Sequence, residues 1–163
     1  MTNAGFPSSR MDLNDIFNQR TINNESSVND IECFQNKYDI KLPDGYIQFI
    51  LEFNNSSLKS SKFLFTRSFK DGFKQSFYLE EVFNINKTEE FYRLFFRVQS
   101  EPELQEANVI PIAKTEGRTY ICIGIDVINW GNIFLWDGDF GVTKQAESLS
   151  DFFDSLVLDK SNV

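Results

Sequence analysis

The residues with the clearest capacity for chemistry are four carboxylates in the last third of the chain. Asp137 and Asp139 flank a glycine, Asp126 follows an apolar run, and Glu116 stands in the turn before that run. Such a group could hold a hard cation or supply an acid–base pair. An Asp-Gly-Asp sequence at a strand end is also ordinary turn chemistry. We rank the turn above a cation site and catalysis last, so a metal-dependent enzyme or cation-binding module remains the least favoured hypothesis.

Other catalytic designs are excluded by what the sequence lacks. The chain contains no histidine, which removes most general-base and zinc-site arrangements. No Gly-rich stretch matches a dinucleotide-binding or phosphate-binding loop. Without a histidine to activate them, Cys33 and Cys122 are predicted to be small buried hydrophobic residues of a reducing compartment. We therefore expect no enzymatic activity, no cofactor and no bound metal.

The acidic charge is concentrated in the C-terminal part. Residues 1–100 carry 12 Lys and Arg against 13 Asp and Glu, whereas residues 101–163 carry 4 against 11, within a net charge of −8. This balance disfavours nucleic acid, whose phosphates must be neutralised by basic side chains. It favours a basic protein partner, because complementary potentials speed encounter. Plain solubility is the alternative explanation of the same charge.

No segment of the sequence predicts a membrane location. Residues 1–10 lack the apolar region of a secretory signal peptide. No apolar run approaches the ~20 residues that a bilayer-spanning helix needs. We expect a cytoplasmic protein.

The two tryptophans have different predicted roles. Trp136 ends an apolar run and by alternation shares a face with Phe134, which predicts a place in the core. Trp130 stands in a turn and is the better interface candidate, since Trp buries a large area for little entropy loss. A purely structural role for both is the alternative. The predicted partner-binding residues are Glu116, Asp126, Trp130, Asp137, Asp139 and Phe140.

A set of basic residues surrounds the predicted hairpin of the middle region. Because these residues are spread singly among aromatic ones, we predict a solvated strand face and no nucleic-acid site. They are Lys59, Lys62, Arg67, Lys70 and Lys74.

Helical spacing dominates the first part of the chain. Residues 12–17 are predicted to form a short helical turn. Ser27, with Asp30 three residues later, resembles a capping box that starts a longer helix. That helix carries the apolar residues Val28, Ile31, Phe34 and Tyr38. Pro43 then opens a second helix, which is predicted to bury Tyr46, Phe49, Ile50 and Phe53.

The middle and C-terminal parts alternate strands with helices. Residues 63–66 and 77–79 predict a hairpin turned by Asp71 and Gly72. A third helix is predicted from Thr88 to about Ser100, burying Phe91, Leu94, Phe95 and Val98. Strands follow at 109–113, 120–125 and 133–136, with Pro111 at an edge or a strand end because it cannot donate to a ladder. A last helix begins near Ser148 and buries Leu149, Phe152, Phe153 and Leu156.

Successive strands joined by short turns are antiparallel, so the pattern predicts an α+β fold. We expect a mainly antiparallel, twisted sheet flanked by helices from the N-terminal part, the middle and the C-terminus. The chain length suits one domain over residues 1–163, with its core at about 12–158 and residues 1–11 frayed.

Two motifs in this order resemble the SUKH superfamily, the Smi/Knr-type domain. The first is Phe34-Gln-x-Lys-Tyr38 followed by Ile40-x-Leu-Pro43-x-x-Tyr46-x-x-Phe49-Ile-Leu51-x-x-Asn54. The second comprises the runs 109–112, 120–123 and 133–137 and the helix Ser148-x-x-x-Phe152-Phe-x-x-Leu156. The likeness covers about residues 27 to 158. The chain departs from the family where Asn54-Asn-Ser56 replaces an Asn-Gly-Gly and where Gly117-Arg118-Thr119 replaces a Gly-Asp pair.

The resemblance implies an α+β domain without known catalysis. Bacterial members are mostly immunity proteins that neutralise a cognate toxin, often a nuclease, of polymorphic or contact-dependent toxin systems. Fungal relatives are intracellular regulatory scaffolds. The resemblance therefore implies an immunity protein for a toxin, with a scaffold for endogenous proteins as the alternative, and the acidic C-terminal part favours a basic toxin.

Overall fold

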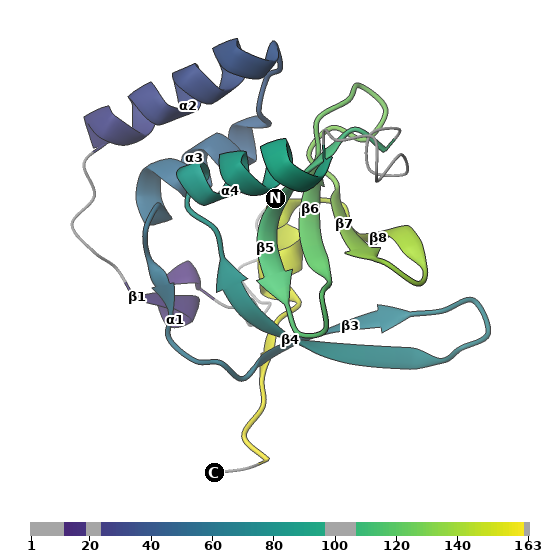
Figure 1. The fold of residues 1–163 in the computed structure, drawn as a ribbon. Helices are drawn as coiled ribbons and strands as arrows, with labels where there is room; N and C mark the ends of the chain where they lie inside the picture. The colour runs from purple at the N-terminus through teal and green to yellow at the C-terminus, as the bar shows by residue number, and fades with distance from the viewer. Residues whose placement is uncertain (1–11, 19–23, 97–106, 162–163) are drawn as a thin grey trace, which may run out of the picture.

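A seven-stranded antiparallel sheet organises the fold (Figure 1). The computed structural model describes residues 12–18, 24–96 and 107–161. The strand order is β8-β7-β6-β5-β4-β3-β9. The strands are β3 (Phe63–Ser68), β4 (Lys74–Val82), β5 (Val109–Thr115), β6 (Tyr120–Gly124), β7 (Ile133–Asp137), β8 (Gly141–Ala146) and β9 (Val157–Leu158). Two short strands, β1 (Phe17–Asn18) and β2 (Ser57–Leu58), pair separately.

Helices cover both faces of the sheet. They are α1 (Leu13–Ile16), α2 (Asn24–Tyr38), α3 (Asp44–Phe53), α4 (Ile85–Phe91), which continues as the π-helix η1 (Tyr92–Phe96), and α6 (Leu149–Asp154). In Figure 1, α4 lies in front of β5 and α6 lies behind the sheet. The main core joins α2, α3 and α6 to one face, and a smaller core around Phe96, Val109 and Cys122 lies on the other. The predicted α+β class is confirmed.

The helices with the clearest apolar stripes form as predicted. α3 buries Tyr46, Phe49, Ile50 and Phe53. α6 is capped by Ser148, whose Oγ accepts a hydrogen bond from the Asp151 amide at 3.0 Å. The rings of Phe49 and Phe153 lie 5.2 Å apart and join the two helices. Each such buried ring contributes roughly 1.5–3 kcal/mol, which fixes α3 and α6 side by side.

Asn54 links three helices inside the protein. Its Nδ2 donates to Ser27 Oγ of α2 at 3.3 Å, and its Oδ1 accepts from the Ile85 amide of α4 at 3.0 Å. Buried amide groups require such partners. The predicted capping role of Ser27 is therefore wrong: α2 already begins at Asn24, and Ser27 lies buried within it. Val28, from the predicted apolar stripe, is exposed.

The third helix differs from its prediction both in the residue at which it begins and in the side chains that it buries. It begins at Ile85, because Asn84 caps it by accepting from the Lys87 amide at 2.8 Å. From Tyr92 onward the turn widens into a π-helix. A π-turn holds an extra residue, so the inward position moves to Phe96, while Leu94 and Phe95 are exposed. The predicted residues Val98 and Ser100 lie outside the described part of the chain.

Pro111 corrects the prediction for its strand. It lies within β5, a central strand between β4 and β6. The register with β6 shifts between Pro111 and Ala113, and the ladder to β4 reaches only as far as Ala113. A bulge beside the end of a ladder tolerates a residue without an N–H.

The edge strand β8 was not predicted from the sequence. Its residues are only half-buried or exposed, so no strong alternation marks it. The strand exists because it pairs with β7, from Ile133 opposite Ala146 to Asp137 opposite Gly141.

The two cysteines lie in different environments. Cys122 is fully buried, and burial raises the pKa of its thiol. Cys33 is exposed on α2, which corrects the prediction that both are buried.

We expect a thiol reagent at mildly alkaline pH to modify one cysteine in the folded protein and both in denaturant, because only the Cys33 thiol is accessible. Absorbance of the released thiolate reports the stoichiometry, and Cys33→Ser should abolish the folded-state reaction. Rapid modification of Cys122 in folded Cys33→Ser would contradict the described packing.

Candidate partner-binding site

The structure separates the six predicted partner-binding residues into two groups. Glu116 lies in the β5–β6 turn, and Asp137, Asp139 and Phe140 lie in and before the β7–β8 turn. Both turns are at the same end of the antiparallel strands. Asp126 and Trp130 lie in the β6–β7 loop, at the opposite end. The six residues therefore do not form one site.

This separation bears on the cation hypothesis. Asp126 lies at the other end of β7 from Asp137 and Asp139, so the three carboxylates do not converge. Across residues 12–18, 24–96 and 107–161, no three His, Cys, Asp or Glu side chains are grouped to hold a metal ion. The oxygens of Asp126 accept from the Asn108 side chain at 2.8 Å and from the Val127 amide at 2.6 Å. Asp126 thus shapes its own loop.

The β6–β7 loop, residues 125–132, is fixed by hydrogen bonds at its base and across its centre. The Gly124 amide donates to the Asn132 carbonyl at 2.9 Å, and the Gly131 amide returns a bond to the Gly124 carbonyl at 3.0 Å. The Asn129 side chain accepts from the Asp126 amide at 2.8 Å and donates to the Ala107 carbonyl at 2.7 Å.

Gly124 is required at the base of this loop. A Cβ atom there would lie 2.1 Å from the Asn129 carbonyl oxygen. Only glycine permits so close an approach of the two backbone segments. The loop conformation is therefore built into the sequence.

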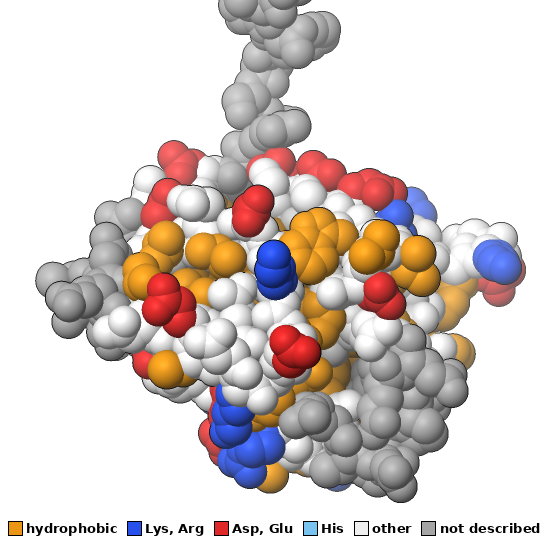
Figure 2. Space-filling view, turned by 90° about the horizontal axis from the view of Figure 1, so that it is seen from above, with side chains coloured by type: hydrophobic (Ala, Val, Ile, Leu, Met, Phe, Trp, Pro, Cys, Tyr) orange, Lys and Arg blue, Asp and Glu red, His pale blue; other side chains and the backbone are white. Residues whose placement is uncertain are grey.

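The fixed loop exposes apolar side chains. Val127 is 90% exposed, Ile128 is 89% exposed and Trp130 is 44% exposed. Figure 2 views the molecule from above Figure 1, the side on which α2 lies, and shows a band of hydrophobic side chains with Asp and Glu side chains along its borders and a Lys or Arg side chain within it. Exposing apolar side chains to water is thermodynamically unfavourable. A cluster of exposed apolar side chains on an ordered loop therefore marks an interaction surface. From the sequence we identified Asp126 and Trp130 but missed Val127 and Ile128. These two residues could have been found as an apolar pair inside a predicted turn.

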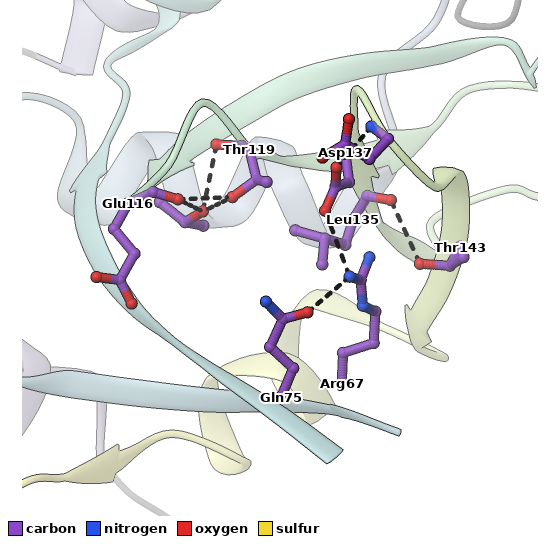
Figure 3. Close-up of polar contacts among 9 residues, drawn as sticks. Arg67, Gln75, Glu116, Thr119, Leu135, Asp137 and Thr143 are labelled. Atoms are coloured by element: carbon purple, nitrogen blue, oxygen red, sulfur yellow. Dashed lines mark hydrogen bonds and ion pairs between the residues drawn. The ribbon is translucent and has the colours of Figure 1, made fainter. Parts of the chain in front are cut away.

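At the other end of the sheet, a buried ion pair joins strands that are not neighbours. Arg67 of β3 is 3% exposed, and its Nη2 lies 3.3 Å from Oδ2 of Asp137 at the end of β7, which is 13% exposed. The same nitrogen donates to Gln75 Oε1 at 2.9 Å (Figure 3). Gln145 of β8 adds a bond of 2.7 Å to the Thr66 carbonyl. The sheet is thus curled so that β7 and β8 meet β3.

Aromatic rings enclose the Arg67 guanidinium. Its central carbon lies 4.5 Å from the ring centre of Phe69, 5.4 Å from that of Phe77 and 5.0 Å from that of Phe140. These cation–π contacts place the predicted residue Phe140 at the surface, packed on Phe69. The prediction that Arg67 belongs to a solvated basic strand face is wrong, because Arg67 is buried. It follows Phe63 and Phe65 in the inward alternation of β3, and that register was the signal available in the sequence.

The remaining acidic candidates differ in how far they are engaged. Glu116 accepts from the Tyr78 amide at 3.1 Å, where the register between β4 and β5 shifts, so its carboxylate extends the ladder. Thr119 closes the same turn by donating to the Glu116 carbonyl at 3.1 Å (Figure 3). Asp139 is exposed, and its amide donates to Asp137 Oδ1 at 2.8 Å. Of Glu116, Asp137 and Asp139, Asp139 is the most available to a partner.

The comparison with known families agrees with the fold and the motifs. The model of the SMI1 / KNR4 family (SUKH-1) matches residues 25–155. The chain belongs to this family, which confirms the predicted superfamily. A comparison with individual curated proteins found no match. In the described part of the chain, no helix has the length and hydrophobicity required to cross a membrane.

Removing either partner of the buried ion pair should destabilise the fold. We expect Arg67→Met and Asp137→Asn each to lower the free energy of unfolding by roughly 2–4 kcal/mol, because each leaves the other group uncompensated. Lys74→Met, at an exposed position of the same hairpin, should cost less than about 0.5 kcal/mol. Urea unfolding followed by tryptophan fluorescence measures all three.

The double variant Arg67→Met/Asp137→Asn should lose less than the sum of the two single changes, because the groups interact directly. The coupling would be contradicted if the two single changes in unfolding free energy summed to that of the double variant. It would also be contradicted if Arg67→Met and Lys74→Met lowered the unfolding free energy equally.

Proposed function

We propose that this protein is an immunity protein that binds and neutralises a cognate toxin of a bacterial polymorphic or contact-dependent toxin system. It acts in the cytoplasm by binding, without catalysis. The observation that carries the proposal is the β6–β7 loop, whose backbone is fixed while Val127 and Ile128 project almost fully into solvent. Membership of the SMI1 / KNR4 family (SUKH-1) supports it, because the bacterial branch that the chain resembles consists mostly of immunity proteins.

A loop of this construction suits tight binding. Association costs free energy for every flexible segment that becomes ordered, and a loop already held by hydrogen bonds avoids much of that cost. Val127, Ile128 and Trp130 supply an apolar centre, and polar residues such as Asp126 supply a rim. An apolar centre with a polar rim is the usual anatomy of a protein interface.

The charge of the chain favours a basic toxin. The net charge is −8, and a nuclease carries basic residues to hold its anionic substrate. Opposite potentials speed the encounter of such a pair and disfavour other partners. A basic nuclease is therefore the toxin class that fits best.

Placing charge on the loop should abolish neutralisation. We expect Val127→Asp/Ile128→Asp to weaken toxin binding by about 100-fold or more, since residues at an interface centre often carry ~2 kcal/mol each. The control Val28→Asp/Val157→Asp adds the same charge at two other exposed valines and should bind normally. Survival on co-expression with the toxin encoded beside this gene, together with the dissociation constant of the purified pair, gives the result.

Two outcomes would overturn the immunity role. One is that the wild-type protein neither protects cells from the neighbouring toxin nor copurifies with it. The other is copurification with the cell's own proteins in the absence of any toxin gene, which would favour the regulatory scaffold instead.

The acidic end of the sheet is tested separately. We expect Asp139→Lys to lower the association rate constant by several-fold and to flatten its dependence on salt, because this exposed charge contributes to electrostatic attraction. Glu90→Lys, an equal charge change on α4, serves as the control. Stopped-flow mixing at several salt concentrations measures the rates, and equal effects of the two changes would remove Asp139 and its neighbour Phe140 from the interface.

A further inference from the structure

A groove of about 500 Å³ lies beside the β6–β7 loop, bordered by α3, by α6 and by Trp130 and Gly131 of the loop. Its apolar lining includes Phe49 and Phe153. The charged side chains that line it are all acidic: Asp44, Glu52, Glu147 and Asp154. A cleft with walls of one charge sign concentrates the opposite charge.

One wall of the groove carries a regular row of acceptors. Asp44, Gln48 and Glu52 are spaced four residues apart on α3, are all exposed and all line the groove. A rise of 1.5 Å per residue places the ends of the row about 12 Å apart along the helix. Within the described residues, neither Asp44 nor Glu52 has a Lys or Arg at ion-pair distance. Glu147 differs, since its Oε1 lies 2.7 Å from Lys144 Nζ.

Helix energetics do not explain Glu52. Asp44 stands in the first turn of α3, where the helix dipole favours a carboxylate. Glu52 stands in the last turn, where the dipole disfavours one. Glu52 is thus an exposed carboxylate that lines the groove, at the end of α3 that the dipole disfavours, without an ion-pair partner among the described residues.

We propose that this groove binds an extended basic segment of the protein partner, with two Lys or Arg side chains on Asp44 and Glu52. Residues four apart on an extended chain are separated by roughly 13 Å, which matches the row on α3. In this arrangement one of the cations lies against Trp130, which is half-exposed at the border, and a hydrophobic residue between the cations lies against the apolar lining. The inference rests on the proposed partner-binding role of the adjoining loop and names the chemistry of what binds there. A second copy of this chain is disfavoured as the occupant, because each copy carries a net charge of −8.

The probe is a short, dye-labelled Gly/Ser peptide with one Leu midway between two Arg residues four apart. Two comparison peptides place the Arg residues two apart or replace them by Glu. We expect the first peptide to bind several-fold more tightly than the second, and the Glu peptide not to bind, as measured by fluorescence anisotropy at low salt.

Neutral variants of the full chain locate the binding. Asp44→Asn/Glu52→Gln should weaken binding of the first peptide by about tenfold, since each solvated pair contributes modestly. Glu32→Gln/Glu90→Gln removes the same charge from exposed positions of α2 and α4 that do not line the groove, and should change the affinity less than about twofold.

Equal weakening by the two double variants would overturn the inference, because it would show attraction to net charge alone. The inference would also be overturned if the affinity did not depend on the spacing of the Arg residues in the peptide. Self-association of the protein that Asp44→Asn/Glu52→Gln abolishes would likewise overturn it. The proposed function fails on different results. If a toxin binds the wild type and Asp44→Asn/Glu52→Gln equally well, the groove does not take part in toxin binding, and the immunity role still stands. If the peptide binds but the protein does not neutralise the toxin, the immunity role is refuted, and the binding of a basic segment in the groove still stands.

Discussion

The ion pair between Arg67 and Asp137 closes the curl of the sheet, and it holds β7, which carries the β6–β7 loop at one end and the turn with Asp139 and Phe140 at the other. In the strand order, β4, β5 and β6 separate β3 from β7, yet the pair joins β3 to β7 and Gln145 joins β8 to Thr66. A buried cation with one carboxylate partner is a costly element, because desolvation opposes the Coulombic attraction. The rings around the guanidinium recover part of that cost, and they bring Phe140 to the surface beside Phe69.

The Arg67–Asp137 ion pair and the hydrogen bonds of the β6–β7 loop hold opposite ends of β7. β7 is held at one end by Asp137, and at the other end it emerges from the loop that Gly124 and Asn129 fasten to β6. Ile133 and Leu135, between these ends, are fully buried in the main core. The hydrogen bonds at the base and across the centre of the loop hold Val127 and Ile128 exposed in the described conformation. Apolar side chains exposed in this way gain free energy when a partner removes them from water.

Local pattern predicted most of the longer elements, but neither the edge strand β8 nor the tertiary contacts between elements. The stripes of α3 and α6 and the three strands after residue 108 follow from period and turn chemistry, which act over a few residues. The errors occurred where tertiary contacts decide. The π-turn moved Phe96 inward, the bulge admitted Pro111 to a central strand, and the curl buried Arg67. For the site, the sequence yielded Asp126 and Trp130 but grouped them with Asp137, although the predicted antiparallel order already places successive turns at opposite ends of the sheet.

The location of the acidic side chains on the surface also could not be predicted from their positions along the chain. Counting along the chain assigns most of the net charge to residues 101–163, yet the carboxylates without a described ion-pair partner in the groove, Asp44 and Glu52, come from α3. Folding places them around the same groove as Trp130, roughly eighty residues further along the chain. Several C-terminal carboxylates are meanwhile engaged by internal partners: Asp137 by Arg67, Glu116 by the Tyr78 amide and Asp126 by Asn108. Under the proposed function, selectivity for a basic partner therefore rests less on how many acids the chain contains than on which of them the fold leaves without an ion-pair partner among the described residues.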